Sequence, residues 1–291
     1  MRKRYPSQAG YFYPKSEEEL RSALKAAFLH GLGPGFLPEV SAGFTGEVIG
    51  AVVPHAGYIY SGHVAAHAYA RLASAGSPNH VFIIGPNHHG IGAPVAVDEH
   101  EAWVTPLGEV EVDLEVAKEL AASEELIRFD FSAHVYEHSI EVQVPFLQFV
   151  FGKGFRIIPI SMLRQDHRAA ARVGQAVARV IREHGLKAYV LASSDMSHYI
   201  PAEVARKKDF KAIERIQRLD VQGLYDVVIE EDISMCGYGP VMVLMKVAQE
   251  LGYTEVRLLK YADSGDVTGD KSEVVAYAAL SFEKPGLARK P

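Results

Sequence analysis

The sequence is poor in cysteine and tryptophan. Its 291 residues include one cysteine, Cys236, and one tryptophan, Trp103. A single cysteine cannot form an internal disulfide, and it excludes both a zinc site with several thiolates and a cysteine-bound iron–sulfur cluster. The lack of disulfides is typical of a reducing compartment, so we expect a cytoplasmic protein. Any metal site must therefore depend mainly on histidines and carboxylates.

Excess positive charge and long apolar runs are also missing. The chain has 30 Lys and Arg against 36 Asp and Glu, and this net charge of −6 argues against nucleic-acid binding. No apolar run approaches the roughly 20 residues that cross a membrane. The basic N-terminus is not followed by the apolar stretch of a secretory signal. We expect neither a nucleic-acid partner nor a membrane partner.

Apolar runs alternate with helical patterns from about residue 45 onward. The runs predict strands at 47–53, 81–84, 155–160, 188–192, 255–261 and 273–282, with a hairpin at 103–112. The helical patterns follow Ser16 and lie at 62–74, 139–151, 166–184, 202–219 (a long exposed helix), 221–229 and 239–251. We find no repeat or linker that would split the chain. The pattern predicts an α/β fold, one domain over residues 1–291, with a central mostly parallel or mixed sheet flanked by helices.

Polar residues follow three of the predicted strands. His55 comes after 47–53, His88 after 81–84, and Asp195 with His198 after 188–192. The carboxyl ends of such strands form the ligand sites of α/β proteins. One histidine after a strand is more often a packing residue, but the repeated pattern favours a common site for His55 and His88.

Other candidates are weaker. His89 is a candidate to orient His88 by a hydrogen bond. His138 and Glu141 share a helix face, which permits metal binding, although capping at Ser139 explains the segment about equally well. Cys236 precedes a predicted helix, whose dipole would favour a thiolate ligand or nucleophile. A small buried apolar role for Cys236 is an equal alternative.

Several motifs together resemble the MEMO family over about residues 6–282. In order along the chain they are Pro54-His55-Ala-Gly-Tyr58, Gly85-Pro86-Asn-His88-His89, Glu137-His138-Ser-Ile-Glu141, Ser193-Ser-Asp195-x-x-His198 and Cys236-Gly237. The resemblance implies a fold similar to class III extradiol non-haem iron dioxygenases. It also implies that His55, His88 and Cys236 are metal ligands, with the cysteine in place of the dioxygenase carboxylate.

The resemblance further implies Fe(II) or copper as the cofactor, with zinc as a possible alternative. His198 matches the acid/base histidine, and Asp195 lies beside it. The implied activity is that of a metal-dependent oxidoreductase-like protein acting on an unknown small substrate or peptide, with ring cleavage in doubt because the thiolate is soft and oxidisable. For prokaryotic members, the resemblance also implies a functional link to AMMECR1-like and radical-SAM proteins.

Two other functions remain open at this point. One is a non-catalytic module that binds a peptide or protein in the same cleft, with Tyr58, Tyr60 and Trp103 as contact candidates. The other is a zinc-dependent hydrolase, since two histidines and one cysteine also suit zinc.

Overall fold

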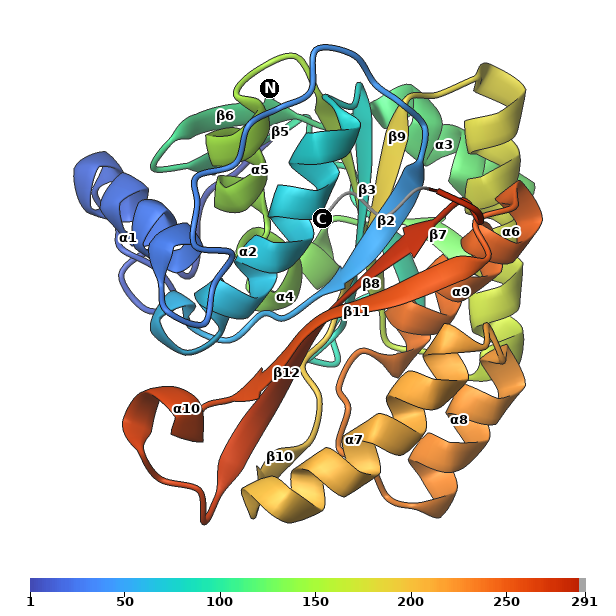
Figure 1. Ribbon diagram of the computed structural model, residues 1–291. Coiled ribbons are helices and arrows are strands. Elements are labelled where there is room, and N and C mark those ends of the chain that lie inside the picture. Colours follow the sequence, from blue (N-terminus) through green and yellow to red (C-terminus); the bar gives the residue numbers. More distant parts are fainter. Residues whose placement is uncertain (288–291) are drawn as a thin grey trace.

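A long mixed β-sheet forms the centre of the fold (Figure 1). The structure, a computed structural model, describes residues 1–287. Across the sheet the strands are β10 (His198–Ile200), β12 (Val274–Glu283), β2 (Val48–Val53), β9 (Ala188–Ser193), β3 (His80–Pro86), β8 (Arg156–Met162), β4 (Val95–Val97) and β7 (Ile127–Phe129), and β11 (Glu255–Asp263) pairs with β12. Strands β2, β9, β3 and β8 are mutually parallel neighbours. The predicted α/β class with a mixed sheet is confirmed.

Helices cover both faces of this sheet. One face carries α1 (Glu17–Leu29), α2 (Tyr58–Ala75), α4 (His138–Glu141) and α5 (Val144–Phe151). The other carries α3 (Leu114–Ser123), α6 (His167–His184), α7 (Ala202–Gln217), α8 (Val221–Glu230) and α9 (Tyr238–Leu251). The central strands are buried on both faces, so Phe82 packs into one apolar cluster and its neighbour Ile83 into the other. This burial explains their nearly continuous apolar sequences.

Smaller elements complete the fold. They are a separate sheet of β1 (Lys3–Arg4), β5 (Ala102–Thr105) and β6 (Gly108–Glu111), the 3₁₀-helix η1 (Ser132–His134) and α10 (Gly265–Thr268). The antiparallel pair β5–β6 corresponds to the predicted hairpin. Within residues 1–287, no helix combines the length and apolar character required to cross a membrane.

Two predicted helices differ from the observed ones. The helix expected at 139–151 is divided into α4 and α5, because Pro145 has no N–H to continue the hydrogen-bond ladder of α4 and instead lies in the first turn of α5. The segment does contain a helix cap: the N-cap of α4 is Glu137, and Ser139 takes part by donating its backbone N–H to the Glu137 carboxylate. Helix α7 is not simply exposed, since Ala205, Ala212 and Ile216 are buried on one side of it.

Candidate metal centre

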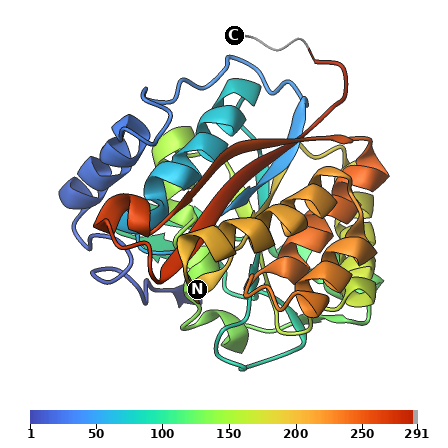
Figure 2. The same cartoon turned by 60° about the horizontal axis from the view of Figure 1, so that its bottom comes forward.

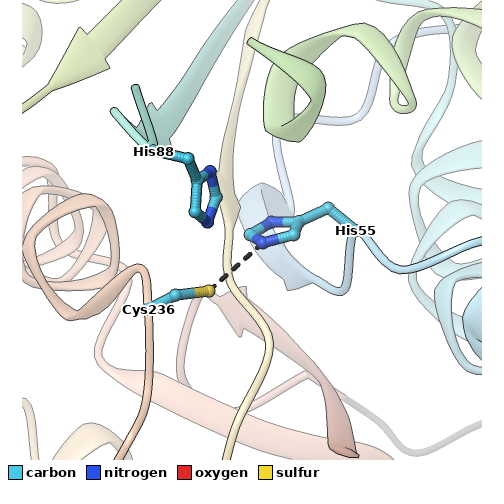
Figure 3. A group of neighbouring side chains, drawn as sticks. All are labelled: His55, His88 and Cys236. Carbon is cyan, nitrogen blue, oxygen red and sulfur yellow. Dashed lines mark hydrogen bonds between the residues drawn. The ribbon is translucent and has the colours of Figure 1, made fainter. Parts of the chain in front are cut away.

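Three potential metal ligands meet at one edge of the sheet. His55 follows β2, His88 follows β3, and Cys236 lies just before α9. One nitrogen of each imidazole and the cysteine sulfur all lie within 4.8 Å of one another. Sγ of Cys236 is 3.2 Å from Nε2 of His55, although the two residues are 181 positions apart. In Figure 3 the three side chains point toward one another from separate segments.

The tautomer of His55 follows from its hydrogen bonds. Ser193 Oγ donates its only hydrogen to the carbonyl of Ser139, at 2.7 Å. The same oxygen must therefore accept from Nδ1 of His55, at 2.8 Å, and it also accepts from the Gln143 amide at 3.0 Å. Nδ1 of His55 thus carries the proton, and Nε2 presents a lone pair. A lone pair in this position is what a metal ligand requires.

His88 is oriented by a carboxylate. Oε2 of Glu137 lies 2.8 Å from Nδ1 of His88, and Oε1 accepts the His88 backbone N–H. Burial of Glu137 opposes its ionisation, but its contacts with His88 outweigh burial and hold the pKa of this carboxyl far below its usual range. Glu137 therefore stays ionised. It leaves Nε2 of His88 for a ligand, in the manner of the carboxylate–histidine pairs of metal sites.

His138 forms a second layer against these residues. Its ring stacks on His88 with centroids 4.5 Å apart, and on Phe12 at the same separation. Burial and the neighbouring rings of His55 and His88 lower the pKa of His138 to about 3. His138 is therefore neutral at physiological pH. With His88 and Glu137 it forms a further group of closely spaced potential ligands.

Burial changes the expected chemistry of Cys236. Burial raises the pKa of this thiol far above its usual range, and the nearby Asp195 carboxylate raises it further. Of the two roles left open for Cys236, burial therefore opposes the dipole-favoured thiolate when no metal ion is bound. Burial also lowers the pKa of His55 well below its usual value, and the proximity of His88 adds to this effect. Both shifts favour the neutral forms, the imidazole of His55 and the thiol of Cys236, when no metal ion is bound.

The acid/base candidates flank the same cluster. Oδ1 of Asp195 accepts the backbone N–H of His55 at 2.8 Å, and Oδ2 lies 3.8 Å from Nε2 of that residue. His198 is half-buried at the start of β10. Its Nδ1 lies 2.7 Å from the carbonyl of Ser234, to which it donates, and its backbone N–H donates to Ser234 Oγ. Asp195 thus contacts His55, whereas Ser234 orients His198 and leaves its Nε2 available.

Two of the weaker candidates lie outside the cluster. His89 is exposed, and its backbone N–H bonds the Asn87 side chain. Glu141 is buried, and its carboxylate is occupied by Arg4, the Ser7 and Gln8 segment and the hydroxyl of Tyr13. Its contacts attach the N-terminal segment to α4. Of the proposed peptide-contact residues, Trp103 and Tyr58 are buried at 1% and 6% exposure, so only Tyr60 is accessible.

Sequence reasoning missed most of the residues that orient the ligands. Glu137, Ser193 and Ser234 each hold one imidazole, and Gln143 supports Ser193. Glu137 and Ser193 belong to the motifs already singled out, one residue before His138 and two residues before Asp195. Nothing in the local pattern of Gln143 or Ser234 indicates their role, since each contacts a residue far away in the sequence.

Comparison with known proteins gives a consistent family assignment. The family model described as Memo-like protein matches residues 4–281. A MEMO1 family protein from Pyrobaculum aerophilum is 49% identical over 97% of this chain and 99% of its own. Similar proteins from Ignicoccus hospitalis and Methanopyrus kandleri are 49% and 48% identical, each over 97% of this chain and 99% of the relative.

Proposed function

The chain belongs to the Memo family, and on that premise we propose that it is a metal-dependent oxidoreductase-like protein that binds Fe(II) or copper. His55, His88 and Cys236 would hold the ion. The observation that carries the proposal is the matched orientation of the two imidazoles. In each, Nδ1 is engaged by a partner and Nε2 is left for the cluster.

The donor set fits such an ion. Two imidazoles and a sulfur suit iron, copper and zinc, and three protein ligands leave further positions open. The His88 side chain is 30% exposed, so the cluster is reachable from solvent on that side. When bound, a redox-active ion would polarise a substrate and exchange electrons with it. It would also stabilise the Cys236 thiolate, which burial alone disfavours.

The surrounding residues would handle protons. His198 donates Nδ1–H to Ser234 and so can accept a proton from a substrate at Nε2, the action of a general base. Asp195 is buried against His55, and burial raises the pKa of this carboxyl; in its ionised form it would add negative charge beside the cluster. That charge would favour a cation over a neutral occupant.

Metal content tests the proposal directly. We expect anaerobically purified wild-type protein to contain close to one equivalent of iron or copper. His55→Ala and Cys236→Ala should lose it, whereas His184→Ala, at a half-exposed histidine of α6, should retain it. Mass spectrometry of the metals would contradict the proposal if the wild type held neither ion, or if His55→Ala held as much as wild type. Stoichiometric zinc lost by the same two variants would instead favour a hydrolase.

A further inference from the structure

A separate cavity lies between the N-terminal segment, α1 and the beginning of α2. Its volume is about 860 Å³, which lies within the roughly 300–1,000 Å³ typical of small-molecule sites. Figures 1 and 2 show α1 against the outer side of α2, at one edge of the molecule. None of His55, His88 and Cys236 is among the described residues that line it. The cavity is therefore distinct from the metal-ligand cluster.

Aromatic rings and alanines form most of its wall. The lining includes the aromatic residues Phe12, Tyr58 and Tyr60, and it also includes the small residues Ala23 and Ala27 of α1. The hydroxyl of Tyr58 donates to the Val142 carbonyl at 2.5 Å, so its polar atom is already satisfied. Rings of this kind bind other rings by stacked or edge-on contacts as well as by burial of apolar surface.

The polar part of the wall has no strong net charge. Lys15 and Glu19 have opposite charges. His63 is 2% exposed, stacks on His30 with centroids 4.4 Å apart, and within residues 1–287 its Nε2 has no hydrogen-bond partner. Burial and the neighbouring His30 lower the pKa of His63 to about 4, so this imidazole is neutral at physiological pH. The wall thus carries no excess charge of one sign that would favour a charged ligand.

We infer that this cavity binds an uncharged aromatic small molecule, with rings on its wall in contact with the ligand. Phe12 connects the cavity to the neighbouring cluster. One side of the Phe12 ring stacks on His138, and the residue also lines the cavity. A ligand that moves Phe12 would therefore change the ring contacts of His138, which packs on both His55 and His88. The binding itself requires no metal ion.

A neutral fluorescent probe tests this site. We expect N-phenyl-1-naphthylamine to bind the wild type, and Ala23→Phe to weaken its binding about tenfold or more by filling the cavity. Ser22→Phe adds the same ring to the preceding residue of α1, which is exposed and does not line the cavity, and this variant should bind the probe normally. Ala26→Phe, at an exposed lining position, replaces Ala23→Phe if that variant does not fold. Equal affinity in the filled variant and in Ser22→Phe would overturn the inference.

Histidine NMR signals locate the probe. Binding should shift the ring signals of His30 and His63, and of His138 through Phe12, but not those of His184 on the opposite helical layer. Probe binding without shifts at His30 and His63 would also overturn the inference. Cys236→Ala should bind the probe as tightly as wild type. The cavity can therefore be established or rejected separately from the metal proposal.

Discussion

Glu137 and His88 are joined by two hydrogen bonds, one to the imidazole Nδ1 and one to the backbone N–H. The carboxylate thus fixes both the ring and the chain that carries it. Glu137 also caps α4 through the Ser139 N–H, at 3.0 Å. A single buried carboxylate therefore connects the loop after β3 to the first turn of α4. It also determines which nitrogen of His88 faces the cluster.

Glu137→Gln should weaken metal binding without abolishing it. The amide keeps the size of the side chain but removes the charge that orients His88. Loss of such a partner typically lowers metal affinity about 10- to 100-fold. Competition with a chelator of known affinity measures this change. Glu115→Gln, at an 89% exposed side chain, is the control and should bind as wild type does. Unchanged affinity in Glu137→Gln would argue against His88 as a ligand.

The sequence was sufficient for the main sheet and for part of the site. Strands β2, β3, β8 and β9 are apolar on both faces, so their sequences are distinct from those of helices, and parallel order brings their carboxyl ends to one edge. The placement of His55 and His88 at a common edge could be predicted from this rule. The short strands Val95–Val97 and Ile127–Phe129 were missed because three residues are too few to show an alternation of apolar and polar side chains. Helix α3 was missed even though its residues have an amphipathic pattern.

Other features depend on contacts between distant segments. The position of Cys236 beside His55 is set by the packing of α9 on the sheet. The hydrogen bonds of Gln143 to Ser193 and of His198 to Ser234 are likewise properties of the folded chain. Burial also bears on the two roles left open for Cys236, because desolvation disfavours the thiolate that a nearby helix dipole would favour. Such effects cannot be calculated from spacing along the sequence.

Arg4→Met should strongly destabilise the fold. Nη1 of Arg4 lies 2.6 Å from Oε1 of Glu141, and both side chains are at most 2% exposed. Removal of one partner leaves a buried charge uncompensated, which costs about 3–5 kcal/mol. Urea unfolding followed by circular dichroism measures the loss. Lys3→Met removes the neighbouring pair with Glu109, whose side chains are 30% and 48% exposed, and should cost less than about 1 kcal/mol. Similar costs for both variants would contradict this account.

Gly50→Ala should disrupt the centre of the sheet. A Cβ at Gly50 would lie 1.9 Å from the carbonyl oxygen of Val190 on the adjacent strand β9. Because the obstacle is backbone in a hydrogen-bonded ladder, relief requires separation of the strands, and we expect a loss of about 3 kcal/mol or more. Gly31→Ala is the control, since its Cβ would have no neighbour within 4 Å. A melting temperature for Gly50→Ala equal to that of the control would show that β2 and β9 are not so closely paired.

Glu283→Gln should reduce stability at neutral pH but not in acid. Burial opposes ionisation of Glu283, but Arg71, Ser281 and Arg257 outweigh it and lower the pKa of this carboxyl. Oε1 lies 2.7 Å from Nη2 of Arg71. A folded-state pKa below the unfolded value contributes stability above the unfolded pKa, and this contribution is lost as the pH falls through the folded pKa.

The difference in unfolding free energy between wild type and Glu283→Gln should therefore be about 1–3 kcal/mol at pH 7 and should shrink below about pH 4. Urea titrations at a series of pH values measure it. Glu47 lies 3.8 Å from the same guanidinium, but its side chain is 41% exposed, so Glu47→Gln should cost less than about 1 kcal/mol at each pH. A difference for Glu283→Gln that stays constant from pH 7 to pH 3 would mean that its charge contributes nothing to stability. The loss would then come from packing alone, because only the ionised carboxylate distinguishes Glu283 from glutamine in a pH-dependent way.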